Sequence, residues 1–362
     1  MYNIHVVIPV YNVEKYVEQA VRSVLDQPYK GIDIVLVDDG SPDNSPAICD
    51  RLASAYDRIH VIHKANGGVS SARNTGIEYF LEKYDNGYIA FLDADDAWVP
   101  DAVTDSISDS INNQWLDDIV CFSNCRCNND MSRFAPVVYQ EEKRVSPAYK
   151  EIWPAQNTHM CSKLYSINLI KNFELKFIDG QQYSEDIMFI YQTVFLADSI
   201  RYLSRPLYLY RSNPGGMMSG ILKRSAIDHF KRIADGWVKS DDFINTHIEV
   251  TKRKAETGYI LAGVYLLDMA RYHYRQHGAS KKLKEVLVNH PQYEIFLNMQ
   301  KDRVSAVQVK DRDMFVKHHF AFKLKYNIIG IVDKIGRVIV GSKLIAPWWE
   351  KRKFPLTYVG KV

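Results

Sequence analysis

The residues with the clearest chemical potential are three aspartates, Asp93, Asp95 and Asp96, in the run Phe91-Leu-Asp-Ala-Asp-Asp-Ala-Trp98. They follow an apolar stretch that is typical of a strand. Carboxylates this close repel one another unless a cation shares the site. Mg²⁺ and Mn²⁺ prefer oxygen ligands and often join carboxylates to phosphates. The cluster therefore predicts a metal-bound phosphate ester, although two aspartates after a strand are also a good turn and helix N-cap.

Strands and helices alternate through the first part of the chain and would bring these aspartates to a sheet edge. Apolar, β-branched runs predict strands, and helical spacing of apolar residues predicts helices. The predicted strands are Ile4–Val10, Ile32–Val37, Ile59–Ile62 and Tyr88–Leu92, and the predicted helices are Val13–Leu25, Pro46–Tyr56 and Ser70–Tyr84. This alternation indicates a mainly parallel sheet with helices on both faces. Asp38-Asp39, Asn66–Arg73 and Asp93–Asp96 would then converge at the carboxyl ends of the strands, where such sheets bind ligands.

The remaining chain falls into a less regular strand region and a helical region. Residues 117–140 resemble strands, Asn168–Asn172 and Glu185–Ala197 resemble helices, and Arg201–Arg211 predicts a pair of strands. Long amphipathic helices are predicted at Ala226–Phe243, Val250–Tyr274 and Lys281–Val288. A glycine-rich break near residues 215–222 lies between the two regions. We therefore expect two domains, 1–220 and 221–362.

The net charge of +3 is unevenly distributed. Residues 301–362 hold 14 Lys/Arg and 5 Asp/Glu, a balance of +9, so the rest of the chain carries −6. The tail also contains Phe, Ile, Val, and Trp348-Trp349 beside Lys351-Arg-Lys353, a pattern that favours an anionic membrane surface. The alternative is a helical packing or dimerising region with a solvated basic face. Nucleic-acid binding is disfavoured because the basic excess lies in an apolar tail.

Neither a membrane-spanning segment nor a disulfide framework is predicted. The sequence contains no run of 18 uncharged apolar residues and no recognisable signal peptide. Its five cysteines are an odd number, which favours a reducing cytosol. Cys121, Cys125 and Cys127 lack the paired spacing typical of zinc sites, so we interpret them as strand residues.

Four motifs occur in order along the first hundred residues: Val7-Ile-Pro-Val-Tyr-Asn12, Val37-Asp-Asp-Gly-Ser41, Asn66-Gly-Gly-Val-Ser-Ser-Ala-Arg-Asn-Thr-Gly76 and Asp93-Ala-Asp-Asp96. Together they resemble glycosyltransferase family 2, the inverting enzymes of the GT-A fold. Tyr183–Phe189 and Tyr210–Ser219 extend the resemblance, which covers roughly residues 3–220. The resemblance implies an α/β GT-A domain, a Rossmann-like mixed sheet flanked by helices that binds a nucleotide sugar, followed by a C-terminal α-helical region.

The resemblance also implies a donor-binding set. Pro9, Val10, Tyr11 and Asn12 would place their backbone against the nucleotide base, and Asn66, Gly67 and Gly68 would lie beneath the ribose and diphosphate. Asp39 would accept the N3–H of uracil, a donor that cytosine lacks. Arg73 would contact phosphate or base, and Arg211 and Ser219 would contact phosphate from a loop hinged at Gly215 and Gly216. Turn capping by Asp39 and a surface position for Arg73 are the alternatives.

The catalytic set follows from the same resemblance. In the motif Asp93-Ala94-Asp95, Asp93 would be the ribose-side contact, and Asp95, with Asp96 nearby, the ligand of Mn²⁺ or Mg²⁺. Asp186 would be the base that deprotonates the acceptor, and Glu185 would orient the acceptor or its own neighbour, although adjacent carboxylates also suit a helix's first turn. Lys163, Trp98 and Asp96 would line the acceptor side. The alternative for Trp98 is a position in the core. No histidine is clearly placed to complete the metal shell; His229 is the nearest downstream.

The implied function is transfer of a sugar from a UDP-sugar to a hydroxyl of a glycan or lipid-linked oligosaccharide in surface polysaccharide synthesis, such as capsule. The enzyme would be cytoplasmic, peripheral on the inner face of the cell membrane, and able to form a homo-oligomer through its helical region. A sugar-nucleotide nucleotidyltransferase would show a Gly-rich basic signature near the first strand, where Pro9–Lys15 has none. A non-catalytic nucleotide-sugar-binding module would have lost Asp95 or Asp186, and both are present.

Overall fold

The structure is a computed structural model that describes residues 3–104, 117–131, 133–137, 142–146, 160–181 and 184–211, with scattered positions between 235 and 358. The chain divides into two compact units, Met1–Gly216 with Thr357–Val362, and Met217–Leu356. The predicted boundary near residues 215–222 and most of the predicted C-terminal helices lie outside the described residues.

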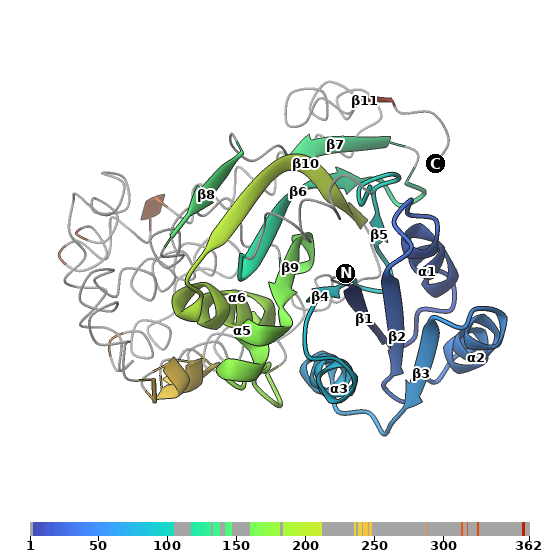
Figure 1. Ribbon diagram of the computed structural model, residues 1–362, viewed down its shortest axis with the longest axis horizontal. Helices are drawn as coiled ribbons and strands as arrows, with labels where there is room; N and C mark the ends of the chain where they lie inside the picture. Colours follow the sequence, from blue (N-terminus) through green and yellow to red (C-terminus); the bar gives the residue numbers. More distant parts are fainter. Residues whose placement is uncertain are drawn as a thin grey trace. The chain divides into compact units, whose positions relative to one another are not determined.

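The first unit is built on four parallel strands (Figure 1). They are β1 (Ile4–Val10), β2 (Ile32–Asp38), β3 (Ile59–His63) and β4 (Tyr88–Phe91), in the spatial order β4-β1-β2-β3. β1, β2 and β4 are almost wholly buried because helices cover both faces of a parallel sheet. The four predicted strands are confirmed to within one residue at each end.

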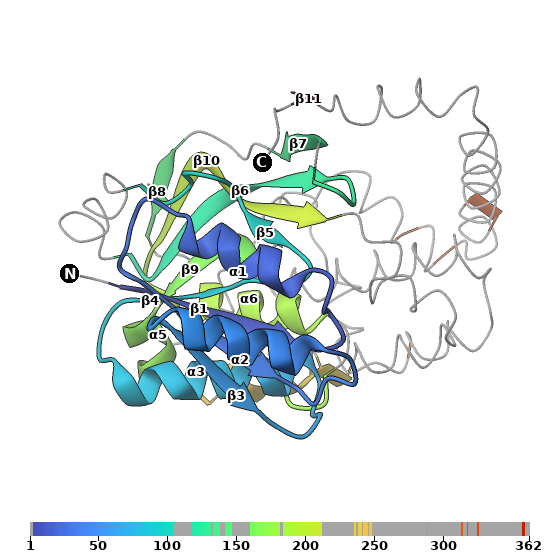
Figure 2. The ribbon, with the colours of Figure 1, turned by 90° about the vertical axis from the view of Figure 1, so that its right-hand side faces the viewer.

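Three helices cover the two faces of these strands. α1 (Val17–Leu25) and α2 (Ser45–Ala55) lie on one face, and α3 (Val69–Lys83) lies on the other (Figures 1 and 2). The change of face follows from right-handed crossovers, because β2 and β3 step away from β1 in one direction and β4 lies on its other side. Gly76 lets α3 approach β1, since a Cβ there would lie 2.3 Å from Cγ1 of Val7. The strand order reverses between β1 and β4, and open α/β sheets bind ligands at the carboxyl ends of the strands at such a point.

α1 begins later than the predicted Val13 because the preceding residues are bonded to the next loop. The backbone N–H of Val13 donates to Oγ of Ser45 at 3.1 Å, and that of Glu14 donates to Oδ2 of Asp43 at 2.9 Å. These bonds join the turn after β1 to the loop after β2. α1 therefore begins at Val17, after these bonded residues.

The sheet continues on the other side of β4 as a mixed sheet. β9 (Lys163–Ser166) is antiparallel to β4, and β6 (Ile119–Cys127) is antiparallel to β9. β7 (Arg133–Val137) and β11 (Thr357–Tyr358) extend this side, while a short 3-10 turn (Met160–Ser162) precedes β9. α5 (Ile167–Asn172) and α6 (Glu185–Leu196) follow β9 in the chain, close to their predicted positions.

One long strand, β10 (Ile200–Arg211), closes this side of the sheet (Figure 1). It runs parallel to β6 and antiparallel to β8 (Lys143–Val145) and β5 (Ala97–Trp98). The prediction of two strands over Arg201–Arg211 was therefore wrong. A single strand bends around Pro206, where its register against β6 shifts on both sides, because proline donates no ladder hydrogen bond.

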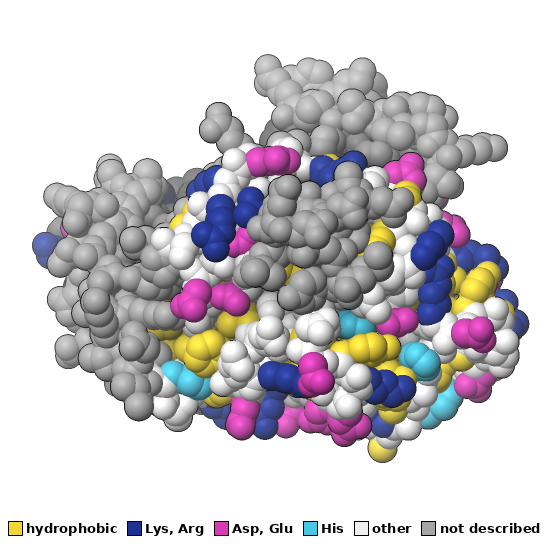
Figure 3. Space-filling view, in the orientation of Figure 1, with side chains coloured by type: hydrophobic (Ala, Val, Ile, Leu, Met, Phe, Trp, Pro, Cys, Tyr) yellow, Lys and Arg dark blue, Asp and Glu magenta, His cyan; other side chains and the backbone are white. Residues whose placement is uncertain are grey.

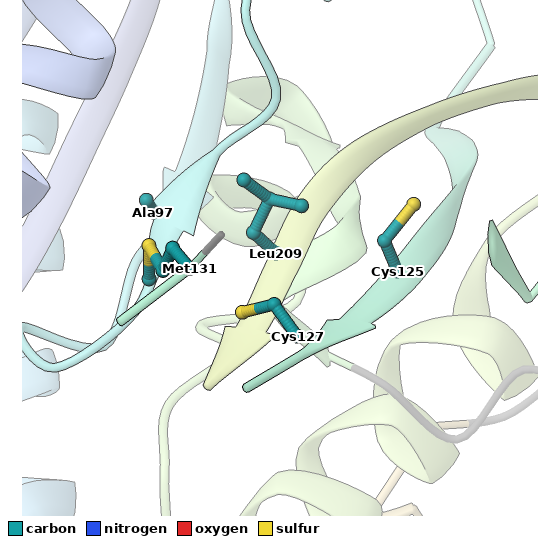
Figure 4. Packing of buried hydrophobic residues seen from close by; sticks show 5 residues of the cluster. All are labelled: Ala97, Cys125, Cys127, Met131 and Leu209. Atoms are coloured by element: carbon teal, nitrogen blue, oxygen red, sulfur yellow. The ribbon is translucent and has the colours of Figure 1, made fainter. Parts of the chain in front are cut away.

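A small apolar cluster packs where β5, β6 and β10 meet (Figure 4). Its buried members are Ala97, Cys125, Cys127, Met131 and Leu209. Burial raises the pKa of Cys125 to about 11 and that of Cys127 to about 12, so both thiols stay protonated near neutral pH. With Cys121, these cysteines lie on β6, as predicted.

The described surface mixes both signs of charge. In the face shown in Figure 3, basic and acidic side chains of the described residues are interspersed. Within the part of the chain that the structure describes, no helix is long and apolar enough to cross a membrane.

Candidate active site

The turn after β1 is shaped by the loop after β2. The backbone N–H of Asp39 donates to the carbonyl of Val10 at 2.9 Å, and that of Asn12 donates to Oγ of Ser41 at 3.3 Å. Asn12 has a φ of 56°, in the left-handed region that asparagine tolerates better than most residues. Tyr11, beside it, has an exposed ring. The predicted base-side residues therefore form one bonded turn with an exposed surface.

Asp39 organises the loop that leads into α3. Its Oδ1 accepts from Nζ of Lys64 at 2.7 Å and from the backbone N–H of Gly67 at 2.9 Å, and its Oδ2 accepts from the N–H of Gly68 at 2.7 Å. Gly68 has a φ of 86°, which favours glycine. A carboxylate offers about four lone-pair sites, so these three bonds leave capacity for one more donor. Sequence reasoning did not single out Lys64, which lies outside the glycine motif.

Arg73 joins two distant acidic segments. It is only 4% exposed; its Nη2 donates to Oδ1 of Asp93 at 2.8 Å and its Nη1 to Oε1 of Glu185 at 2.9 Å. The guanidinium lies over the ring of Phe177, 5.3 Å from the centroid. Burial by itself would lower the pKa of Arg73, but the charges of Asp93 and Glu185 outweigh burial and hold it above its ordinary value. One permanent cation therefore links the loop after β4 to the start of α6.

The three aspartates of the acidic loop have different surroundings. Asp93 pairs with Arg73, and Asp96 is buried. Oδ2 of Asp96 accepts from the hydroxyl of Tyr208 at 2.5 Å, and its Oδ1 accepts from the backbone N–H of Arg211 at 2.7 Å. Burial raises the pKa of Asp96 well above its ordinary value, and the charges of Asp93 and Asp95 raise it further. Asp95 is half-buried, and Ala94 is buried.

The Arg211 side chain is engaged within the protein at all three nitrogens. Nε donates to the carbonyl of Asp95 at 2.5 Å, Nη1 donates to the carbonyl of Asn129, and Nη2 donates to Oε1 of Gln19 at 2.6 Å. Its guanidinium also lies over the ring of Tyr16 at 4.8 Å. Arg211 therefore contacts the acidic loop itself. The predicted Ser219, Gly215, Gly216 and His229 lie outside the described residues.

Glu185 and Asp186 begin α6, and the residue before them has an uncommon backbone conformation. Ser184, the N-cap, has a φ of 58°, in the left-handed region that residues other than glycine adopt uncommonly. Oδ1 of Asp186 accepts from the N–H of Ile187 at 2.7 Å. Burial, and then the charge of Glu185, raise the pKa of Asp186 to about 7, against the opposing charge of Arg73. Asp186 can therefore gain and lose a proton near neutral pH.

α3 also holds the segment that leads to Glu185. The side-chain amide of Asn74 donates to the carbonyl of Phe177 at 2.9 Å, and its Oδ1 accepts from the N–H of Phe177 at 2.8 Å. Oγ of Ser70 donates to the carbonyl of Gln181 at 3.1 Å. Asn74 lies beside Arg73 in a motif that we had noted, but no sequence signal identified Phe177, 103 residues away, as its partner.

The residues predicted on the acceptor side are buried. Lys163 and Trp98 are each 1% exposed, and Asp96 is 3% exposed. Burial lowers the pKa of Lys163. Trp98 lies on β5, with its backbone N–H donating to Oγ of Ser23 at 2.9 Å. This placement favours the alternative of a core tryptophan.

The acidic loop fits a divalent metal only if the substrate supplies ligands. Among the described residues, no group of three or more His, Cys, Asp and Glu side chains is placed to hold a metal ion. Asp93 and Asp96 are engaged by Arg73 and by Tyr208, as described above. Mg²⁺ is commonly held by one or two carboxylates together with phosphates and water. The donor set around Asp95 is therefore compatible with a metal–diphosphate complex.

Comparison with known proteins identifies the family. The family model described as Glycosyl transferase family 2 matches residues 5–167. An uncharacterized glycosyltransferase of Bacillus subtilis, EpsJ, is 31% identical over 234 residues, covering 63% of this chain and 67% of EpsJ. The chain belongs to glycosyltransferase family 2. This family 2 chain is also 44% identical over 98 residues to the minor teichoic acid biosynthesis protein GgaB of B. subtilis, covering 26% of the chain but only 10% of GgaB.

A solved structure confirms the fold of this family 2 protein. Residues 1–349 of TarS from S. aureus superpose with a TM-score of 0.59 at 16% identity, covering 92% of each chain. The same protein has been solved in complex with UDP-GlcNAc, with a TM-score of 0.54. At this identity the likeness concerns the fold alone, and it confirms the predicted GT-A architecture.

We predict that Arg73→Met destabilises the protein strongly, because it leaves two carboxylates without their shared cation. Removing one partner of a buried ion pair lowers the free energy of unfolding by about 3 kcal/mol. In urea unfolding, the double variant Arg73→Met/Glu185→Gln should lose less stability than the sum of the two single variants. Arg22→Met, which breaks the exposed pair with Glu18, is the control and should change stability far less. Additive losses would show that Arg73 and Glu185 do not act together.

Proposed function

We propose that this protein is a metal-dependent, inverting glycosyltransferase that uses a UDP-sugar. The observation that carries the proposal is the position of Arg73, which joins Asp93 of the acidic motif to Glu185, the neighbour of Asp186. A displacement on a nucleotide sugar needs a diphosphate site and a base near the same anomeric carbon. The guanidinium of Arg73 supports a shared site for the diphosphate and the base, because it bonds both the acidic loop and the start of α6.

The donor site lies along the carboxyl ends of β1, β2 and β4. In this proposal, Pro9–Asn12 contact the nucleotide base through their backbone, and Asp39 accepts the N3–H of uracil. The remaining acceptor capacity of Asp39 supports this role, since Lys64, Gly67 and Gly68 already hold the carboxylate in one orientation. Asn66–Gly68 lie under the ribose and diphosphate. The UDP-GlcNAc complex of TarS supports a UDP-sugar donor without identifying the sugar here.

Asp95 would hold Mn²⁺ or Mg²⁺ together with the diphosphate, and the bound ion would supply positive charge to the leaving group. Asp93 faces the ribose side and is oriented by Arg73. Arg73 itself then acts within the protein as the counter-ion of Asp93 and Glu185. This role fits the two ion pairs of Arg73, which hold its guanidinium between Asp93 and Glu185.

Asp186 is the proposed base. It takes the proton of the acceptor hydroxyl while that oxygen forms a bond to the anomeric carbon, and the bond from this carbon to the diphosphate breaks with inversion. A base works best when its pKa is close to the working pH, and the pKa of about 7 for Asp186 meets this condition. Glu185, fixed by Arg73, orients the acceptor and raises the basicity of its neighbour.

The acceptor would be a glycan or lipid-linked oligosaccharide of a surface polymer. Residues 1–220 would form the catalytic domain. The name of GgaB, a teichoic acid biosynthesis protein, supports this polymer class. The basic, Trp-containing tail would attach the enzyme to the inner face of the cell membrane, and the helical region 221–362 would allow homo-oligomers. These regions lie almost entirely outside the described residues.

The first prediction from this proposal concerns the donor. The protein should hydrolyse one UDP-sugar from a panel of UDP-, GDP- and dTDP-sugars, only with Mn²⁺ or Mg²⁺ present. Asp95→Ala should lose this activity at least a hundredfold, because a ligand of the metal is removed. Asp85→Ala, an exposed aspartate paired with Lys171, is the control and should retain it. Turnover of a GDP-sugar alone would contradict the proposed role of Asp39.

The second prediction concerns pH. Because Asp186 must be ionised to accept a proton, transfer should fall as the pH drops through about 7. Asp186→Asn should abolish transfer at every pH and still bind UDP. The control is Asp118→Asn. Burial also raises the pKa of Asp118, but its Oδ2 accepts from the backbone N–H groups of Asp198 and Ser199. A transfer rate that stays constant from pH 8 to pH 5 would rule out Asp186 as the base.

The third prediction concerns the membrane. The full chain should float with vesicles containing anionic lipid and not with neutral vesicles, because 14 basic residues lie in its last 62 positions. Added salt should release it, since screening weakens surface electrostatics. A variant with Lys351, Arg352 and Lys353 replaced by glutamine should float less. Equal flotation with neutral vesicles would refute the electrostatic attachment.

A further inference from the structure

The acidic loop is anchored to β10 at four points. The Tyr208 hydroxyl donates to Oδ2 of Asp96 at 2.5 Å and accepts from the backbone N–H of Asp93 at 3.4 Å. The backbone N–H of Arg211 donates to Oδ1 of Asp96 at 2.7 Å, and its Nε donates to the carbonyl of Asp95 at 2.5 Å. Every aspartate of the motif is thus bonded, through side chain or backbone, to one of two residues of β10.

The residues after the acidic loop are fixed to the same strand. Ala97 and Trp98 form β5, which pairs with Leu209 and Tyr208 of β10. Ala97 and Leu209 also belong to the buried cluster shown in Figure 4. The loop therefore has a rigid support at its downstream end, and the hydroxyl of Tyr208 reaches back to its first residue, Asp93.

Arg211 extends this support to two further elements. Its side chain bonds Gln19 of α1 and the carbonyl of Asn129 in the turn after β6, in addition to Asp95. A buried guanidinium is tolerated when it is hydrogen-bonded, and each of the three nitrogens of Arg211 donates one bond within the protein.

We propose that Tyr208 and Arg211 are positioning residues that clamp the Asp93–Asp96 loop onto β10 and thereby fix the direction in which Asp95 meets a metal–nucleotide diphosphate. The clamp acts through the loop, and neither side chain needs to touch the substrate. This inference rests on the proposed function for its ligand, but its structural part, the anchoring of the loop, does not.

Tyr208→Phe tests the clamp because it removes one hydroxyl and keeps the ring. Removing a residue that orients a metal ligand commonly weakens binding by tenfold or more. We therefore expect the ratio of UDP affinity with Mn²⁺ to UDP affinity without it, measured by calorimetry, to fall about tenfold. Donor KM should rise with it. Arg211→Lys, which keeps the charge and loses the fork, should lower the same ratio.

The matched control is Tyr88→Phe. The Tyr88 hydroxyl is also buried and donates to the carbonyl of Asp117 at 2.8 Å, but Tyr88 lies at the opposite end of β4 from the acidic loop. Tyr88→Phe should lower thermal stability about as much as Tyr208→Phe does. It should leave the ratio of UDP affinity with Mn²⁺ to UDP affinity without it unchanged. Equal ratios for Tyr208→Phe and the wild type would overturn the proposal and leave Tyr208 as an ordinary core residue.

A second measurement separates the clamp from the proposed function. Amide hydrogen exchange of a peptide covering residues 92–99 reports local opening of the loop without any ligand. Exchange should increase in Tyr208→Phe and not in Tyr88→Phe. Absence of UDP binding in the wild type would defeat the proposed function, yet faster exchange would still support the anchoring. Unchanged exchange in Tyr208→Phe would overturn the anchoring, whatever the protein binds.

Discussion

The buried guanidinium of Arg73 is the interaction on which the rest of the site depends. A cation that is 4% exposed is costly unless paired, so Asp93 and Glu185 must both lie within bonding distance of it. This requirement brings together two segments that are far apart in sequence. Other features serve it: Gly76 lets α3 lie close to β1, and Asn74 holds the backbone of Phe177, whose ring lies beneath the guanidinium.

Aspartates of the candidate site have different roles because their surroundings differ. The carboxylate of Asp39 is held by an ammonium and two backbone N–H groups, whereas that of Asp96 is buried against Tyr208 and the backbone of Arg211. Asp186 has a pKa raised to about 7 by burial and by Glu185. Pairs of acidic groups whose environments separate their pKa values are a common basis for assigning acid and base roles. The environment therefore assigns the proposed chemistry more than the residue type does.

The parallel half of the fold could be predicted from the sequence because buried parallel strands are uninterrupted β-branched runs. The β10 strand could not, since Pro206 and the alternation around it are equally typical of a turn between two strands. Motifs singled out the residues of the candidate site but not their partners. Arg73 was expected at phosphate or base and Arg211 at phosphate. Their bonds to Glu185 and Gln19 span 112 and 192 residues, distances at which local pattern carries no information.

Calorimetric titration of the full chain with UDP and with CDP, each with and without Mn²⁺, asks whether the edge beside β1 and β4 is a metal-dependent site for a uridine diphosphate. We expect that UDP binds, that Mn²⁺ tightens binding, and that CDP binds at least tenfold more weakly because cytosine offers no N3–H to Asp39. Equal binding of UDP and CDP, or binding of UDP that does not change with Mn²⁺, would contradict this expectation.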